Sequence, residues 1–199
     1  MMDTTTPAAN PKRFDAIALA AEIEKRFGPV VSRSSEDRGT GASFLVGHPS
    51  ALISLCQFLF SVAGCSFGGL IVEQLDEWNL RYVFLNPRSG WVHCILRLPL
   101  NTRTVPSISL PVNAADWYER EAEDLFGLAF EEHPRLGDFV LHDQVWQEGL
   151  APMRRAFDAG QMHFEKRPRE DWRPMLVVQD PGAFAMPVGP VYEGGIGES

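Results

Sequence analysis

The sequence predicts an α+β fold: a single domain in which helices pack on an antiparallel sheet, followed by an extended C-terminal tail. Two observations lead to this prediction. The apolar spacing changes between helical and strand-like runs along the chain, and the strand-like runs in the middle are joined by short turn sequences. Short connections favour antiparallel neighbours, because parallel strands need long crossovers. With 45% hydrophobic residues among 199, the chain can bury a core without a disulfide or a metal.

The N-terminal part begins with a stretch rich in Thr, Ala and Pro, and we expect residues 1–12 to be disordered. Apolar residues at helical spacing then predict a helix over residues 14–27, which a Gly-Pro pair ends. Residues 30–46 are expected to form two short extended pieces around a polar turn. A helix is predicted over residues 51–63; apolar side chains cover most of its circumference, so we expect it to pack against a sheet.

The middle of the chain contains three runs rich in β-branched and aromatic residues, which are typical of strands. These strands are expected at residues 66–75, 80–85 and 91–98. Their connections, Asp-Glu and Asn-Pro-Arg-Ser-Gly, are turn sequences, so the three strands should form an antiparallel meander. A further short strand is predicted at residues 107–110. The composition then turns to charge, proline and glycine, which predicts a domain over residues 13–160 and an extended tail over 161–199.

The composition disfavours several classes of function. The formal charge of 18 − 26 = −8, with basic residues scattered along the chain, is unlike that of a nucleic-acid-binding protein. The three cysteines include no C-x-x-C pair, so we expect neither an iron–sulfur cluster nor a zinc site, but buried single thiols. No signal-peptide layout is visible, and the longest apolar stretch, residues 51–64, is too short to span a membrane. We therefore expect a cytoplasmic protein that meets a membrane only through partners.

A third helix, predicted over residues 114–126, contains the densest group of charged residues. Asn113 is the expected N-cap and Gly127 the expected left-handed C-cap. The apolar side of the helix is predicted to consist of Trp117, Tyr118, Ala122, Leu125 and Phe126.

Glu121 falls on the same predicted apolar side, and a carboxylate buried there needs a partner because leaving it unpaired costs several kcal/mol. Two arginines follow in the sequence, Arg154 and Arg155. We predict that one of them pairs with Glu121 or Asp124 and so ties the segment after the helix back onto it.

The run W-Y-E-R-E-A-E-D-L-F-G-L-A-F, residues 117–130, is similar to the E-R-E-x-x-D-[LM]-[FY]-G-[IL]-x-F signature of the C subunit, or 30 kDa subunit, of NADH:quinone oxidoreductase (respiratory complex I). Residues 133–136, H-P-R-L, resemble the G-H-P-x-L block of that family, and residues 152–157, P-M-R-R-A-F, resemble its P-L-R-K-D-[FY] block. The chain departs from the pattern at Glu132, at Gly137-Asp138 and at Ala156, where the family commonly has Gly, an Arg pair and an acid.

A related domain forms the N-terminal part of the large subunit of energy-converting (group 4) [NiFe] hydrogenases and formate hydrogenlyases. The segment M-P-V-G-P-V, residues 186–191, resembles the junction to their metal-binding domain. That domain continues with a histidine and paired C-x-x-C motifs, whereas this sequence has Tyr192 and no such cysteines. The resemblance leaves open whether the host complex is a quinone reductase or a hydrogenase.

The resemblance implies a non-catalytic scaffold subunit of a membrane-associated electron-transfer complex. It implies no cofactor, catalytic residue or metal in this chain, with NADH and quinone, or [NiFe], and iron–sulfur clusters in partner subunits. The implied partners are the large subunit and an iron–sulfur subunit. The residues expected to form the fold and the interface are Glu119, Arg120, Glu121, Asp124, Phe126, Gly127, His133, Pro134, Arg154 and Arg155.

Two alternatives remain open from the sequence. The chain could be a small stand-alone enzyme that uses the acidic helix segment 116–124 with His133, in which case a closed concave pocket should surround these groups. It could also be an adaptor domain outside any redox complex, with the same fold. For His133 itself, a hydrogen bond that anchors a loop is the commoner role and a proton relay the rarer one.

Overall fold

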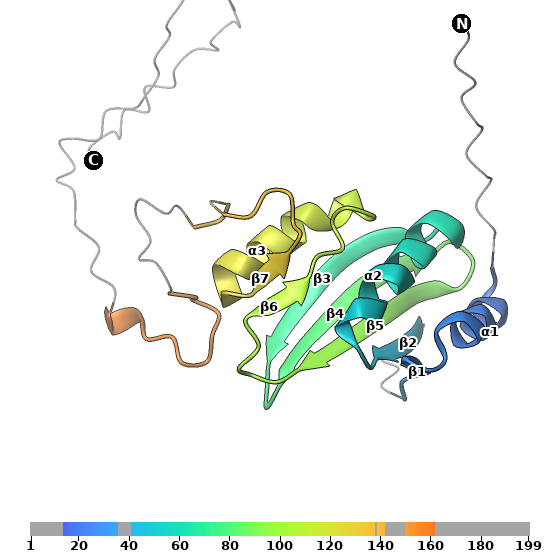
Figure 1. Ribbon diagram of the computed structural model, residues 1–199, viewed down its shortest axis with the longest axis horizontal. Helices are drawn as coiled ribbons and strands as arrows, with labels where there is room; N and C mark the ends of the chain where they lie inside the picture. Colours follow the sequence, from blue (N-terminus) through green and yellow to red (C-terminus); the bar gives the residue numbers. More distant parts are fainter. Residues whose placement is uncertain (1–13, 36–40, 138, 142–149, 162–199) are drawn as a thin grey trace, which may run out of the picture. The chain divides into compact units, whose positions relative to one another are not determined.

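The structure, a computed structural model, describes residues 14–35, 41–137, 139–141 and 150–161 (Figure 1). The expected disorder of residues 1–12 and the tail from residue 162 onward lie outside the described residues. In chain order the described elements are α1 (Ala16–Phe27), β1 (Val31–Arg33), β2 (Gly41–Val46), α2 (Pro49–Gln57), the π-helical turn η1 (Phe58–Val62), β3 (Ser66–Gln74), β4 (Trp78–Asn86), β5 (Gly90–Leu98), β6 (Thr104–Pro106), the 3-10 turn η2 (Asn113–Ala115), α3 (Asp116–Phe126), β7 (Ala129–Glu131) and the 3-10 turn η3 (Ala159–Gln161).

The main sheet has five strands in the order β1-β2-β5-β4-β3. The meander β3-β4-β5 is antiparallel, as the short turns predict, and β1 is antiparallel to β2. The pairing of β2 with β5 is parallel, so the sheet is mixed. The physical reason is the helical crossover through α2, which returns the chain to the same end of the sheet before β3 begins. An odd number of strands in the meander then brings β5 alongside β2 in the same direction.

One face of the sheet forms the core. Alternate residues of β4 point into it, and Trp78, Leu80, Tyr82 and Phe84 are all fully buried. Figure 1 shows α2 lying across this sheet, with α3 beside β3, β6 and β7. The ring of Trp78 meets Phe126 of α3 edge to face, with 6.2 Å between the centroids. The expectation that the apolar helix packs against a sheet is therefore confirmed, and the α+β single-domain fold with it.

The region between the sheet and α3 differs from the sequence-based expectation. The strand predicted at residues 107–110 is wrong: the strand is β6, three residues earlier, and it pairs in parallel with β7. Ser107 to Leu110 form a turn instead, because the hydroxyl of Ser107 accepts hydrogen bonds within the turn, from the backbone N–H of Ser109 among others. Both strands of this second sheet are only three residues long, which is too short for an alternating apolar pattern to show.

The N-terminus of α3 is also not as predicted. Asn113 opens the 3-10 turn η2, and the α-helix begins at Asp116, preceded by Ala115 without a side-chain cap. The predicted C-terminus is confirmed: Gly127 has φ 64° and ψ 39°, the left-handed conformation in which glycine is favoured. Its backbone N–H donates to the carbonyl of Glu123 at 2.7 Å.

Candidate functional site

The buried face of α3 matches the predicted apolar side only in part: Ala122 lies on it and Phe126 packs on Trp78, but Trp117 does not belong to it. Ala115, Glu119 and Ala122 are buried, whereas Trp117 is 65% exposed and Glu121 is exposed. The prediction that Glu121 is the buried acid is therefore wrong, and Glu119 takes that place. The prediction assumed that the largest apolar side chains mark the buried face. In fact the inward stripe contains small residues, and the buried carboxylate is accommodated by hydrogen bonds.

Glu119 is fully buried and binds the turn that follows β6. Its Oε2 accepts a hydrogen bond from the hydroxyl of Ser107 at 2.6 Å, and its Oε1 accepts one from the backbone N–H of Ile108 at 2.8 Å. The Ser107 hydroxyl also contacts that of Ser109 at 2.7 Å. These bonds replace the water that the carboxylate loses, and they join α3 to a segment eleven to twelve residues earlier in the chain.

His133 lies between two carboxylates of α3, with its side chain fully buried. Its Nε2 is 3.6 Å from Oδ1 of Asp116 and 3.8 Å from Oε2 of Glu119. Its Nδ1 accepts the backbone N–H of Arg135 at 3.1 Å, so in the neutral ring the proton belongs on Nε2. That nitrogen also lies 3.3 Å from the carbonyl oxygen of Asp116, to which it can donate. The geometry fits the expected role of an anchor for the loop.

The guanidinium of Arg135 completes this group by donating to Oδ2 of Asp116 at 3.0 Å. We call Asp116, Glu119, His133 and Arg135 the buried charge cluster; only Arg135 has a largely exposed side chain. The residue before the histidine, Glu132, has φ 63°, a left-handed conformation that is uncommon outside glycine. The loop is therefore bent sharply to bring His133 under α3.

The pKa of Glu119 is raised from 4.5 to about 7. Burial is the largest cause; the hydrogen bonds from Ser107, Ile108 and Ser109 oppose it, and the nearby charge of Asp116 adds a smaller upward contribution. The folded protein therefore holds a proton on Glu119 that the unfolded chain loses near pH 4.5. Consequently the contribution of this group to the free energy of unfolding falls as the pH rises from 4.5 to about 7, and does not change above that range.

The core behind Glu119 contains thiols and a phenol. Burial raises the pKa of the Cys56 thiol well above its usual value, and the neighbouring Cys94 raises it as well. Burial, and then the charge of Glu119, raise the pKa of Tyr82 in the same way. Cys65 is buried too, and burial raises its pKa to about 12. The three cysteines are free and buried, as the sequence predicts.

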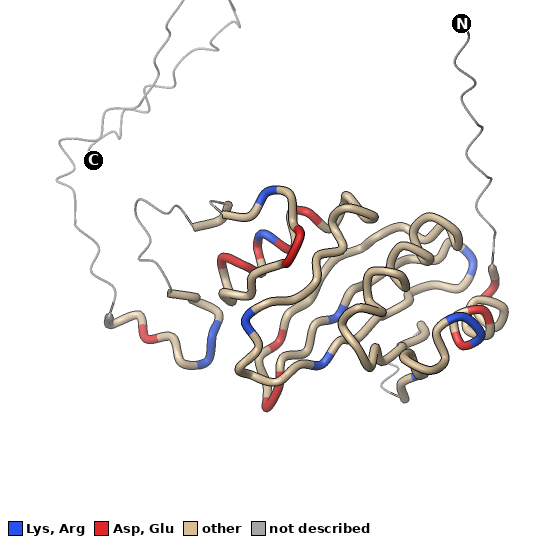
Figure 2. The backbone as a smooth tube through the Cα atoms, viewed as in Figure 1, with Lys and Arg blue, Asp and Glu red and all other residues tan. Residues whose placement is uncertain are grey.

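The remaining charged residues of α3 hold the loop that follows the cluster; Figure 2 shows that most charged positions along α3 are acidic. Asp124 accepts the backbone N–H groups of Val140 and Leu141 at 2.6 and 3.0 Å. Arg120 donates to the carbonyl of Gly137 at 3.1 Å. Glu123 accepts the N–H of the same glycine at 2.9 Å. These side chains are thus engaged by the backbone of this chain.

Arg154 does tie the downstream segment to α3, but by a different contact from the predicted one. Its Nε donates to the carbonyl of Phe126 at 2.5 Å and its Nη2 to the carbonyl of Gly127 at 3.0 Å. The predicted pairing with Glu121 or Asp124 is wrong, because the last carbonyls of a helix lack intrahelical partners and attract a cation. A Cβ at Gly127 would lie 3.2 Å from the guanidinium, so the glycine also makes room for Arg154.

Arg155 binds another part of the domain. Its backbone N–H donates to the side-chain carbonyl of Gln74 at 2.9 Å, and its guanidinium lies 3.4 Å from the carbonyl of Leu75. Pro134 is exposed in the turn between His133 and Arg135. The signature residues are therefore not gathered in one site; they fix α3 to the segments on either side of it.

Sequence reasoning missed Ser107, Asp116 and Arg135 as partners in the buried charge cluster. The sequence contains one usable signal: Ser107 and Ser109 flank an apolar residue just before the helix, a pattern that can satisfy a buried carboxylate. Nothing in the helix itself distinguishes Glu119 from Glu121.

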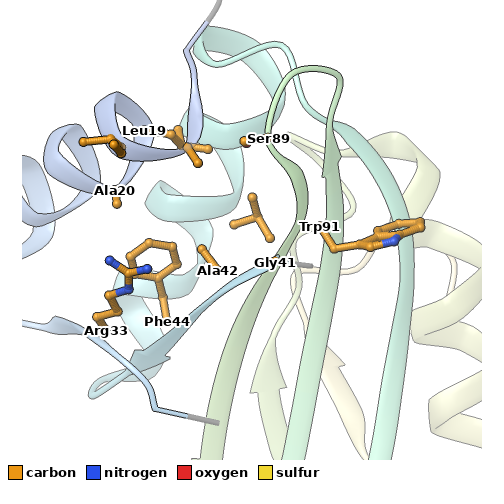
Figure 3. A pocket seen from close by; sticks show the side chains of 11 residues that line it. Leu19, Ala20, Arg33, Gly41, Ala42, Phe44, Ser89 and Trp91 are labelled. Carbon is orange, nitrogen blue, oxygen red and sulfur yellow. The ribbon is translucent and has the colours of Figure 1, made fainter. Parts of the chain in front are cut away.

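The pocket in Figure 3 lies elsewhere, between α1, β2 and β5. It measures about 220 Å³ and is lined by apolar residues, among them Leu19, Ala20 and Phe44, with the guanidinium of Arg33 beside the Phe44 ring. None of the signature residues lines it. In the described part of the chain, no group of three or more His, Cys, Asp or Glu side chains is arranged to hold a metal ion. No described helix is both long enough and apolar enough to cross a membrane.

Glu119→Gln should flatten the pH dependence of stability. A pKa raised from 4.5 to about 7 corresponds to about 3 kcal/mol, which the wild-type protein loses across that pH range through this group. Glutamine keeps the shape and an acceptor for Ile108 while removing the titration. Urea unfolding at pH values from about 4 to about 8 measures the effect, because this range brackets the pKa of Glu119 in the unfolded chain and in the folded protein. Glu121→Gln, on the exposed side of the same helix, is the control; its free energy of unfolding should change with pH as in the wild type. If Glu119→Gln also kept the wild-type pH dependence, Glu119 would not be the titrating group.

Arg154→Ala should destabilise the domain by about 1–2 kcal/mol, since two carbonyls at the end of α3 lose a charged donor. Arg155→Ala is the matched control and should cost under about 0.5 kcal/mol, because the side chain is exposed and its contact long. Arg154→Lys should recover part of the loss. Equal destabilisation by the two alanine variants in urea unfolding would refute the proposed cap.

Comparison with known proteins gives a consistent result. The C subunit of the NADH-quinone oxidoreductase of Sinorhizobium medicae is 32% identical over 146 residues, covering 70% of this chain and 70% of that protein. The corresponding subunit of Dinoroseobacter shibae is 35% identical over 129 residues, covering 59% of this chain and 57% of that one. The C subunit of the F(420)H(2) dehydrogenase of Methanosarcina mazei is 30% identical over 99 residues, covering 47% of this chain and 59% of that protein.

Among solved structures, a chain of the membrane-bound sulfane sulfur reductase, an archaeal respiratory membrane complex, matches the fold with a TM-score of 0.54. The match is 21% identical in sequence and covers 71% of this chain and 84% of the other. The family described as the respiratory-chain NADH dehydrogenase 30 Kd subunit matches residues 45–163, a range that begins in β2 and includes every signature residue. The chain therefore belongs to the family of the respiratory-chain NADH dehydrogenase 30 kDa subunit.

Proposed function

We propose that the protein is a non-catalytic scaffold subunit of a membrane-associated electron-transfer complex. The observation that supports this most is the use of its charged signature residues. Glu119, Asp124 and Arg154 each bind backbone groups of this chain and hold α3 in place between its flanking segments. Side chains with such contacts hold the domain in one conformation. A scaffold subunit needs a fixed conformation in order to position the other subunits.

The partners would be the large subunit, which contains the quinone or [NiFe] region, and an iron–sulfur subunit. In this proposal the chain binds no cofactor of its own, and it keeps the partners' redox centres within electron-transfer distance of one another. It would lie on the cytoplasmic side of the cell membrane, attached through the partners. The names of the relatives favour a quinone reductase as the host complex over a hydrogenase. The segment 186–191, which resembles the hydrogenase junction, lies outside the described residues.

The burial of His133 argues against a stand-alone enzyme at the acidic helix. Its side chain is fully covered, and so is that of Glu119, so a substrate would have to displace packed residues to reach either. The exposed acid of the helix, Glu121, has no titratable neighbour among the described residues with which it forms an ion pair. An adaptor outside any redox complex would have the same fold and differs only in its partners.

Purification of the tagged full-length protein from its native host, under mild detergent, tests the proposal. We expect the large subunit and an iron–sulfur subunit to co-purify, with the electron paramagnetic resonance signals of reduced clusters in the same fraction. Deletion of the chain should abolish assembly of that complex. The matched control is the same host with an untagged protein, carried through the same steps. Recovery of the tagged chain as a monomer without cluster signals would overturn the proposal.

A further inference from the structure

Trp117 is exposed to 65% although it belongs to a helix that packs against the domain. A single exposed apolar side chain on a protein surface is common and needs no explanation. A large aromatic side chain that is both exposed and held in one position is different, because a rigid aromatic group is the usual centre of a protein–protein interface. The contacts of Trp117 decide between these two cases.

The loop after the buried charge cluster supports Trp117. The ring of Phe139 meets the indole edge to face, with 5.3 Å between centroids and 81° between planes. The guanidinium of Arg120 lies over the Phe139 ring, 4.6 Å from its centroid. Arg120 is itself held by the carbonyl of Gly137. The indole is therefore supported by a chain of contacts that leads back into α3.

Asp124 fixes the same loop from the other side. It accepts the N–H groups of Val140 and Leu141, and so holds the backbone directly after Phe139. The side chain of Val140 is 51% exposed. We call Trp117, Phe139 and Val140 the aromatic platform. Because these contacts already support Trp117 and Phe139, docking on the platform would cost little side-chain entropy.

The charge beside the platform limits which partner fits. Glu121 is one helical turn after Trp117 and is exposed, and no hydrogen bond or ion pair holds its carboxylate within the described residues. The chain as a whole has a formal charge of −8. A basic surface would be attracted to this side of α3, and a Lys or Arg next to an apolar pocket could pair with Glu121 while the pocket receives Trp117.

We propose that the aromatic platform and Glu121 form a docking surface for another subunit of the complex, one that presents an apolar pocket bordered by Lys or Arg. This inference rests on the proposed scaffold function and adds the place of contact and the chemistry of the partner. It also gives a role to Trp117 and Glu121, which α3 leaves exposed.

The face of the sheet that no described helix covers offers a rival surface. Trp91 of β5 is 43% exposed there and packs over Gly68. A Cβ added at Gly68 would lie 3.0 Å from the indole ring and would also contact Val83. Like Trp117 it is a partly exposed tryptophan on a regular element. It lies on a strand of the main sheet and not on α3, so replacing it removes a similar side chain at a different site. Trp91→Ala is therefore the matched control.

The test compares the full-length wild type with Trp117→Ala, Glu121→Lys and Trp91→Ala, each expressed with the same tag in a host that lacks the native chain. The readout is the amount of iron–sulfur complex recovered, identified by its subunits and its cluster signals. Trp117→Ala should reduce recovery at limiting concentration by about thirtyfold, as expected for the central residue of an interface. Glu121→Lys should reduce it as well, most strongly at low salt. Trp91→Ala should assemble like wild type.

Thermal unfolding of each purified variant separates misfolding from lost docking. Glu121→Lys changes an exposed side chain without a partner among the described residues, so it keeps the test decisive even if Trp117→Ala loosens the loop. Normal assembly of both α3 variants would overturn the inference while leaving the scaffold function intact. So would loss of assembly confined to Trp91→Ala, since it would place the contact on the sheet. Failure of the wild type itself to assemble would refute the scaffold function and the docking surface together.

Discussion

The position of α3 depends on one buried carboxylate. Glu119 is covered completely, and its two oxygens bind the hydroxyl of Ser107 and the N–H of Ile108. An apolar residue at this position could pack, but it could not bind the backbone of the turn that follows β6. The carboxylate thus defines both the rotation of the helix and the path of the turn, at the cost of desolvating an acid. The rotation decides which side chains of α3 face inward and which, like Trp117, face outward.

The other charged residues of the helix depend on that rotation. Once Glu119 points inward, Arg120, Glu123 and Asp124 lie where the loop over residues 137–141 can bind them. Arg154 then caps the two carbonyls that the end of the helix leaves without partners. A sequence with many acids on one helix suggests a catalytic or metal site. In this protein the acidic residues of α3 fasten the helix to the turn that follows β6 and to the loop over residues 137–141.

Much of the fold could be predicted from local patterns. The strands of the meander, the helices and the left-handed Gly127 follow from periodicity, turn residues and backbone preference, which act over a few residues. The rest depends on contacts between distant segments. The burial of Glu119 in place of Glu121 depends on the donors in the turn at Ser107, and no spacing within the helix reveals them. The parallel pairing of β2 with β5 likewise depends on a strand that enters the sheet much later in the sequence.

That late strand has a consequence for the order of folding. Gly41 of β2 pairs with Trp91 of β5, fifty residues further along, and β4 also pairs with β5. As the chain leaves the ribosome, β1 and β2 on one side and β3 and β4 on the other therefore lack the strand that joins them. Contacts of such sequence separation form slowly. The growing chain must expose apolar surface of both halves until β5 is synthesised, so this interval is where chaperones and premature aggregation would compete for it.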